Sequence, residues 1–151
     1  MKVSECMTRD VEVATPEMSL RDAADLMGQI DAGALPVRQN ERLVGMITDR
    51  DIAIRAVAAG LGPETLVNEV MSREIKYCYE DEDVDHVVRN MGDIQVRRLP
   101  VVSRSKQLVG IVALADLACH AEDRANLGMA LSDISRDSGL HSQISGGNWA
   151  H

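Results

Sequence analysis

The sequence predicts an α+β (mixed α/β) fold built from two tandem copies of one small unit. Two observations carry this prediction. The chain matches itself when it is shifted by 64 positions, and both copies show the same order of apolar patterns. Each copy reads as a short strand, an amphipathic helix, a two-stranded hairpin and a second helix. Because a unit of about 60 residues buries its core poorly alone, we expect the copies to pack together with clefts where they meet.

The repeat rests on identical residues at matching positions. At an offset of 64, Val3, Glu5, Met7, Arg9, Met27, Gly28, Ile30, Leu35, Pro36 and Val37 match Val67, Glu69, Met71, Arg73, Met91, Gly92, Ile94, Leu99, Pro100 and Val101. One inserted residue then aligns Leu43, Val44, Gly45 and Asp51 with Leu108, Val109, Gly110 and Asp116. We therefore divide the chain into a first repeat (1–62), a second repeat (63–122) and a C-terminal helix with a flexible tail (123–151).

The elements follow in the same order in both copies. The predicted opening strands are Val11–Ala14 and Ile75–Cys78, and the predicted hairpins pair Leu35–Arg38 with Leu43–Thr48 and Leu99–Ser103 with Leu108–Ala113. Helical spacing links Leu20, Ala23, Ala24, Met27 and Ile30 in one copy, and Val84, Val87, Val88, Met91 and Ile94 in the other. Ser19, with Asp22 three residues later, and Asp83 are predicted helix caps. A second helix is expected to open at Asp51 or Asp116, and Gly60 to end the first of these.

The composition argues against several function classes. The net charge of −8 and the 2% of aromatic residues disfavour nucleic-acid binding, which needs basic surface and stacking platforms. Cys6, Cys78 and Cys119 are odd in number and widely spaced, and the four histidines show no ligand spacing, so we expect no metal site. No apolar stretch approaches the length of a membrane span or a signal core. We expect a soluble cytoplasmic protein that does not bind membranes.

Two motifs then point to a known family. ALPV at Ala34–Val37, followed by GMITDRD at Gly45–Asp51, resembles the signature of a cystathionine-β-synthase (CBS) domain, and RLPV at Arg98–Val101 with GIVALAD at Gly110–Asp116 resembles a second copy. The tandem pair, covering roughly residues 1–122, is similar to a stand-alone Bateman module. This resemblance implies a regulatory, non-enzymatic module that binds AMP, ADP, ATP, NAD-type molecules or S-adenosylmethionine between its repeats. It also implies a homodimer, with no required cofactor.

The first copy supplies the principal candidate site. Thr48 ends a strand and can hydrogen-bond a phosphate oxygen, Arg50 can add a charge-assisted contact, and the ionised carboxylate of Asp51 can accept both ribose hydroxyls. The resemblance adds further candidates, which are Gly33, Ala34, Ile75, Tyr77, Val96 and Arg97. Helix capping is the alternative role for Thr48 and Asp51, since both residue types cap helices well.

The second copy departs from the motif. It keeps Asp116, but Ala113 replaces the hydroxyl residue, and Leu114 and Ala115 replace Asp49 and Arg50. The resemblance leaves a second candidate site made of Arg98, Asp116, Val13 and Ala14, with Arg97 as a further basic residue. Surface ion pairing is the alternative role of these two arginines.

Two other functions stay open beside ligand sensing. The missing hydroxyl at Ala113 suggests an interaction module with vestigial ligand sites and an unidentified effector protein. An enzyme acting on a nucleotide is disfavoured, since no nucleophile, metal site or triad base stands out.

Beyond the repeats, residues 121–135 are expected to be helical with Leu127, Leu131 and Ile134 on one face. The Ser/Gly-rich stretch 138–151, which contains Trp149, is expected to be flexible.

Overall fold

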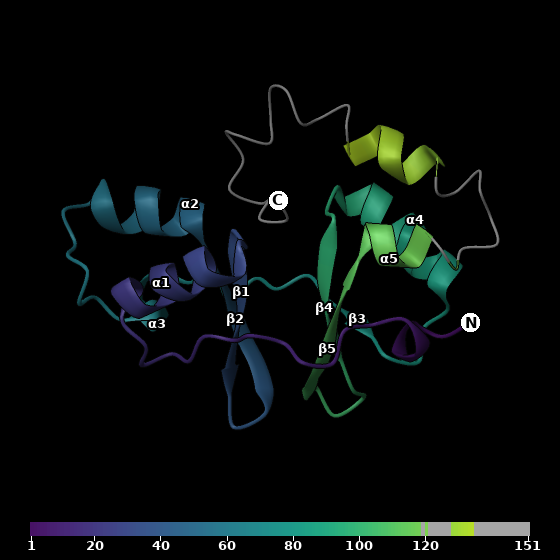
Figure 1. Cartoon of the computed structure of the whole chain (residues 1–151), viewed down its shortest axis with the longest axis horizontal. Helices are drawn as coiled ribbons and strands as arrows, with labels where there is room; N and C mark the ends of the chain where they lie inside the picture. Colours follow the sequence, from purple (N-terminus) through teal and green to yellow (C-terminus); the bar gives the residue numbers. More distant parts are fainter. Residues whose placement is uncertain (119, 121–127, 135–151) are drawn as a thin grey trace. The chain divides into compact units, whose positions relative to one another are not determined.

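A computed structural model describes residues 1–118, 120 and 128–134 (Figure 1). The elements are the 3-10 helix η1 (Val3–Glu5), α1 (Leu20–Ile30), β1 (Ala34–Gln39), β2 (Arg42–Thr48), α2 (Asp49–Asp51) continuing into the π-helix η2 (Ile52–Val57), α3 (Val67–Val70), β3 (Cys78–Tyr79), α4 (Val84–Ile94), β4 (Arg98–Val102), β5 (Leu108–Ala113) and α5 (Leu114–Ala118). A further helix covers 128–134. The mixture of helices with small sheets confirms the predicted fold class.

The chain forms two units, and their limits differ from those of the repeats. The first unit is Glu12–Ile75, whereas the second unit combines Met1–Val11 with the chain from Lys76 onward. Each unit therefore contains the helices and hairpin of one repeat together with the opening segment of the other repeat. β1 pairs with β2 in the first unit, and β3, β4 and β5 form one sheet in the second.

We call the opening residues of the two repeats, 1–11 and 63–75, the exchanged segments. In each unit, the exchanged segment is hydrogen-bonded to the strand that follows the hairpin turn. In the first unit, Met46 and Ser72 exchange backbone hydrogen bonds of 2.9 and 2.8 Å. In the second unit, Thr8 and Ile111 exchange two of 2.9 Å. These two bridges occupy matching positions of the repeat. Each unit is therefore completed by residues from the opposite repeat.

The repeated glycine of the motif lies under each exchanged segment. A Cβ atom on Gly45 would lie 2.8 Å from the Met71 Sδ and 2.9 Å from the Ser72 carbonyl oxygen. A Cβ on Gly110 would lie 2.7 Å from the Met7 Sδ and a similar distance from the backbone of the next residue. Real Cβ atoms do not approach backbone oxygen so closely, so only glycine lets the exchanged segment pair with the strand.

The opening strands are shorter than predicted. In place of a strand over 11–14, only Ala14 pairs, in parallel with Val37. The strand predicted at 75–78 lies instead at β3, where Cys78 and Tyr79 pair in parallel with β4. These strands are short because the chain crosses from one unit to the other just before them. The chain is held in one unit at residue 8 or 72 and must reach the other unit before it can join that sheet.

The long helices confirm the predicted caps and most of the predicted core. The Ser19 hydroxyl accepts the Asp22 N–H at 3.1 Å, and the Asp83 carboxylate accepts the N–H of residue 85 at 3.1 Å. Gly60 has the positive φ of 81° expected of a helix-ending residue. Leu20, Ala23 and Met27 are buried in the first unit, and Val84, Val87, Val88 and Met91 in the second. Ala24 and Ile30 are exposed, which the periodicity did not predict.

The second helices begin two residues earlier than predicted. α2 begins at Asp49 rather than Asp51, because the Thr48 side chain occupies the N-cap position. α5 likewise begins at Leu114 rather than Asp116. In both copies the aspartate of the motif is thus the third residue of its helix rather than the first.

The helix at 128–134 lies on α4 in the second unit (Figure 1). Ala130 and Ile134 are buried, Ala130 packs against Gly92, and the Gln95 side chain donates to the Asp133 carbonyl at 3.1 Å. Leu131, which is predicted on the same face as Ile134, is half exposed. Leu127 and the stretch 138–151 with Trp149 lie outside the described residues. Within the described ranges, no helix is long and apolar enough to cross a bilayer.

The close approach at the motif glycines predicts a stability cost for any side chain there. We expect Gly45→Ala and Gly110→Ala each to lower the free energy of unfolding by about 1–3 kcal/mol, because the methyl group must displace backbone. Urea denaturation followed by circular dichroism measures this change. Gly62→Ala is the control, since no described residue lies within 4 Å of its Cβ position, and it should change stability by less than about 0.5 kcal/mol. Equal effects at all three positions would contradict the packing argument.

Candidate functional site

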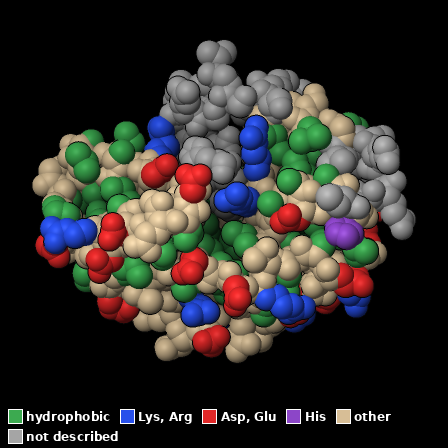
Figure 2. Space-filling view, viewed as in Figure 1, with side chains coloured by type: hydrophobic (Ala, Val, Ile, Leu, Met, Phe, Trp, Pro, Cys, Tyr) green, Lys and Arg blue, Asp and Glu red, His purple; other side chains and the backbone are tan. Residues whose placement is uncertain are grey.

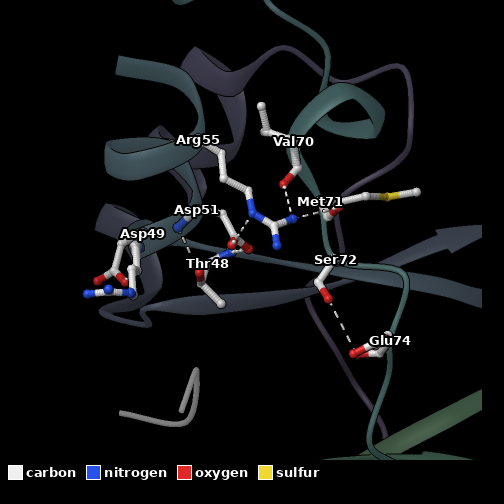
Figure 3. Close-up of polar contacts among 9 residues, drawn as sticks. Thr48, Asp49, Asp51, Arg55, Val70, Met71, Ser72 and Glu74 are labelled. Carbon is white, nitrogen blue, oxygen red and sulfur yellow. Dashed lines mark hydrogen bonds and ion pairs between the residues drawn. The ribbon is translucent and has the colours of Figure 1, made fainter. Parts of the chain in front are cut away.

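The strongest polar arrangement in the first unit is a reciprocal cap at the end of β2 (Figure 3). The Thr48 hydroxyl accepts the Asp51 N–H at 3.0 Å, and the Asp51 Oδ2 accepts the Thr48 N–H at 3.1 Å. Thr48 is only 3% exposed and Asp51 only 7%. The capping role considered as an alternative is therefore present. It fixes both side chains at the point where strand becomes helix.

Arg55 connects this cap to the exchanged segment. Its Nε lies 3.8 Å from the Asp51 Oδ1, one helical turn away, and one of its terminal nitrogens donates to the carbonyls of Val70 and Met71 at 3.4 and 3.5 Å. These contacts are drawn in Figure 3. The distance of 3.8 Å is that of an ion pair rather than a good hydrogen bond. Asp51 Oδ1 can therefore take a closer donor if Arg55 gives way.

Burial controls the charge of Asp51. Desolvation raises the pKa of the Asp51 carboxyl above its ordinary value, although the hydrogen bonds with Thr48 and the positive charges of Arg55 and Arg50 act in the opposite direction. A buried carboxylate of this kind gains from any additional donor that approaches it. The arrangement suits a ligand that brings hydroxyl groups.

The other first-unit candidates surround the same cap. The Gly33 carbonyl accepts the Asp49 N–H at 2.9 Å, and Ala34 lies opposite Thr48 in the strand register. Arg50 is half-buried on the first turn of the helix, next to Asp51. The structure thus brings Gly33, Ala34, Thr48, Arg50 and Asp51 together. Ile75, which is half-buried, ends the first unit at the far end of the exchanged segment.

Tyr77, Val96 and Arg97 belong to the second unit. Val96 is 0% exposed, so its side chain is part of the core of that unit. The Tyr77 ring stands edge-on to that of Tyr79, with centroids 5.6 Å apart, and its hydroxyl bonds the Lys106 ammonium. Arg97 is exposed, and its carbonyl accepts the N–H that opens α5 at 2.8 Å.

The second candidate site lacks the cap of the first. Ala113 lies opposite Arg98 in the register and has no hydroxyl, so the side-chain half of a reciprocal cap cannot form with Asp116. Asp116 and Arg98 are both exposed, in contrast to the buried Asp51. Of the two apolar candidates in the first unit, Val13 is half-buried, whereas Ala14 is completely buried in the core.

Sequence reasoning missed Arg55 and Lys106. The spacing of four residues from Asp51 to Arg55 was a visible signal for an ion pair on a helix. No local sequence pattern predicts the contact between Lys106 and Tyr77, because the two residues are 29 positions apart and lie in a hairpin turn and an earlier segment. Within the part of the chain that the structure describes, no group of three or more His, Cys, Asp or Glu residues could hold a metal ion.

Comparisons with known proteins confirm the tandem repeat. A family model described as the CBS domain matches twice, over residues 3–57 and 67–122. The CBS domain-containing protein YhcV of Bacillus subtilis is 41% identical over 133 residues, covering 88% of this chain and 94% of its own.

Two solved structures extend the comparison. Hypoxic Response Protein I with two coordinated zinc ions superimposes with a TM-score of 0.70 at 37% identity, covering 80% of this chain and 99% of that one. The CBS domain pair of protein MJ0100, in complex with 5-methylthioadenosine and S-adenosyl-L-methionine, gives a TM-score of 0.66 at 30% identity and covers 80% and 94%.

The raised pKa of Asp51 predicts a pH-dependent stability difference. A carboxyl with a folded pKa above its unfolded value stabilises the fold most at low pH, and this contribution is lost as the pH rises through the folded pKa. Asp51→Asn keeps an acceptor for the Thr48 N–H but does not ionise. We expect the native protein to lose stability relative to Asp51→Asn as the pH rises from the ordinary carboxyl range through the raised pKa of Asp51. Urea unfolding at several pH values measures the difference, and a flat or rising difference would contradict the burial argument.

Cys78 should be inert toward alkylation. It is 3% exposed, and burial with the nearby Glu82 charge raises the pKa of its thiol to about 12. At pH 8 only about one thiol in ten thousand is then ionised, against about one in four for an ordinary cysteine. Iodoacetamide treatment followed by peptide mass mapping should leave Cys78 unmodified in the folded protein and modify it in urea. Rapid modification of Cys78 under native conditions would contradict its burial.

Proposed function

The chain belongs to the CBS domain family as two tandem repeats, and on this premise we propose that it is a regulatory module that binds an adenosyl ligand through its first repeat. The proposed ligand class comprises AMP, ADP, ATP, NAD-type molecules and S-adenosylmethionine. Thr48, Arg50 and Asp51 form its polar contacts, with the backbone of Gly33 and Ala34 beside them. The remaining candidates, Ile75, Tyr77, Val96 and Arg97, stay predictions from the resemblance.

The buried cap of Thr48 and Asp51 is the observation that supports this proposal most. A carboxylate has about four lone-pair positions, and Asp51 uses one on the Thr48 N–H and a second, at longer distance, on Arg55. Two vicinal ribose hydroxyls are donors that can occupy the others. Thr48 accepts one N–H and keeps its hydroxyl proton for an acceptor on the ligand. The cap thus holds both groups in place before a ligand arrives, which lowers the ordering cost of binding.

Charge favours an anionic group near Arg50. Arg50 is half-buried on the first helical turn after β2, where its guanidinium can attract a phosphate group. Asp49, which is exposed next to it, disfavours a high negative charge on the ligand. Ligands with one or two phosphates, or with a neutral group at this position, therefore suit the first repeat better than a triphosphate.

Arg55 offers a route from ligand to regulation. A ribose hydroxyl on Asp51 Oδ1 competes with Arg55, whose other contacts hold the carbonyls of Val70 and Met71 in the exchanged segment. Binding therefore favours a state in which these contacts are altered. A ligand shifts such an equilibrium only by its differential affinity for the two states. We propose that an effector protein recognises this difference.

The alternative function is a protein–protein interaction module whose ligand sites are vestigial. Ala113 and the exposed Asp116 favour this view for the second repeat, because neither the hydroxyl nor the buried acceptor of the first repeat is retained. The two views agree on the second repeat and differ on the first. Ligand binding by the first repeat decides between them.

We expect the two aspartates to differ in their effect on binding. Asp51→Asn should weaken the preferred adenosyl ligand by about 10-fold or more, because the ionised acceptor for the ribose hydroxyls is lost. Asp116→Asn should change affinity by less than about 3-fold. Thermal-shift screening with AMP, ADP, ATP, NAD, NADH and S-adenosylmethionine identifies the ligand, and titration calorimetry measures the affinities.

The Asn variants separate binding from folding, since each keeps a side-chain acceptor. Circular dichroism and unfolding curves check that Asp51→Asn is folded at the temperature of the titration. No stabilisation by any of the six compounds would refute the ligand proposal and favour the interaction module. A larger loss with Asp116→Asn would refute the choice of the first repeat as the principal site.

A further inference from the structure

One methionine occupies the same position in both exchanged segments and packs on the motif glycine of each unit. The Met7 Sδ lies 2.7 Å from the position that a Cβ atom on Gly110 would take, and the Met71 Sδ lies 2.8 Å from the corresponding position on Gly45. A thioether fits closely against a glycine because the side chain is unbranched and its sulfur is polarizable. Each exchanged segment is therefore held against its strand by a sulfur contact.

The two sulfur contacts differ in their access to solvent. Met71 is only 6% exposed, whereas Met7 is half-buried. Figure 1 shows the N-terminal segment crossing β5, to which Thr8 is hydrogen-bonded. Figure 2, drawn from the same side, shows hydrophobic and charged side chains at the surface of this part of the second unit. A small solute can therefore reach the Met7 sulfur more readily than the Met71 sulfur.

The other methionines do not combine solvent access with a contact on a strand glycine. Met1 and Met129 are 52% and 64% exposed, so little packing depends on their side chains. Met18 is half-buried and packs against core side chains of the first unit. The rest are at most 6% exposed, namely Met27, Met46 and Met91. Met7 is thus the methionine at which a solute could alter how the chain pairs.

An oxygen atom on the Met7 sulfur would conflict with its contact. Oxidation converts the apolar thioether into a polar sulfoxide, which disrupts packed interfaces. The new oxygen accepts hydrogen bonds, but the N–H groups of residues 7, 8 and 111 already donate to backbone carbonyls. On the side of Gly110, the sulfur is too close to the strand to admit another atom. The sulfoxide must therefore turn toward water, which draws the side chain away from the strand.

The contact at Met7 holds a segment that completes the second unit. The Val3 N–H donates to the Glu82 carbonyl at 2.9 Å, and the Ser4 N–H donates to the Glu80 carbonyl at 3.0 Å. Val3 is 0% exposed, so the segment also buries apolar surface. Because these contacts lie within a few residues of Met7, loss of the sulfur contact favours local opening of the segment.

Cys78 reports on this opening. Cys78 pairs with Val101, and Val101 pairs with Gly110, so these residues form one row across the sheet. Met7 packs on the Gly110 end of that row. Cys78 is 3% exposed, and burial, a nearby carboxylate and the Cys6 thiol raise the pKa of its own thiol, in that order. The N-terminal segment thus lies close enough to Cys78 to shield it.

We propose that Met7 is an oxidation site at which a peroxide releases the N-terminal exchanged segment from the second unit. With hydrogen peroxide, the sulfur lone pair attacks one oxygen, the O–O bond breaks and an S–O bond forms. Sulfur is oxidised by two electrons, and the second oxygen leaves as water after taking the proton of the first. The first unit keeps its exchanged segment, because Met71 is shielded. This inference does not depend on the ligand proposed above.

Treatment of the folded full chain with hydrogen peroxide, followed by peptide mass mapping, tests the site. We expect Met7 to form sulfoxide at least about 10-fold faster than Met71, because susceptibility follows exposure. Met1 and Met129 should react fastest and serve as internal standards. The reaction is run at about pH 5, where thiols stay protonated, and dithiothreitol then reduces any thiols that were reversibly oxidised.

Release of the segment is measured with iodoacetamide. After oxidation, Cys78 should be alkylated about 10-fold or more faster than in untreated protein, because local opening exposes it. Met7→Leu keeps an apolar side chain of similar size but cannot form a sulfoxide, so peroxide should leave its Cys78 protected. Met71→Leu is the matched control and should respond to peroxide as the wild type does. Met7→Gln, which places a polar amide at this position, should expose Cys78 without peroxide.

Reduction of the oxidised wild type by methionine sulfoxide reductases should restore the protection of Cys78, and this measurement does not rely on any variant. Protection that stays lost once Met7 is reduced would overturn the proposal, and so would equal oxidation rates at Met7 and Met71. A Cys78 that stays protected while Met7 is fully oxidised would also overturn it, as would equal sensitisation of Met7→Leu by peroxide. Circular dichroism checks that each variant is folded before treatment.

Discussion

The close contact between the motif glycines and the exchanged segments is the constraint on which the rest of the structure depends. Gly45 and Gly110 let a backbone from the opposite repeat lie against β2 and β5, and a side chain at either position would collide with that backbone. The bridges Met46–Ser72 and Thr8–Ile111 form only because of this approach. The glycine of the family motif, which precedes the candidate site residues Thr48 and Asp51 in sequence, therefore has a packing role.

The candidate site depends on the same contact. Thr48 and Asp51 follow the strand that the exchanged segment pairs with, and Arg55 then bonds the carbonyls of Val70 and Met71 in that segment. Arg55 thus connects Asp51 to backbone that comes from the second repeat. The second unit has Ala113 where the first has Thr48, so the corresponding connection cannot be built there in the same way.

Local pattern predicted what local interactions determine. The spacing of apolar residues and the caps at Ser19 and Asp83 located both long helices, because caps and periodicity depend on residues within a few positions. The opening strands were predicted too long, because their pairing depends on where the chain crosses between units. Gly28 and Gly92 occupy matching positions of the repeat. No local signal distinguishes Gly28, whose Cβ position has no described residue within 4 Å, from Gly92, which packs against Ala130. That difference arises from a helix some 40 residues further along the chain, in a contact that only tertiary structure creates.

The exchange of segments also has a consequence for the connectivity of the chain. A cut in the linker at 60–65 would yield two fragments, each carrying the piece that completes the other. Neither fragment could complete its own unit without the opening segment carried by the other fragment, so the two would have to associate as a complex. The linker then serves mainly to raise the effective concentration of each half for the other. The same trade between two identical single-repeat chains would give a segment-swapped dimer, which is a physical route by which a duplicated chain like this one can arise.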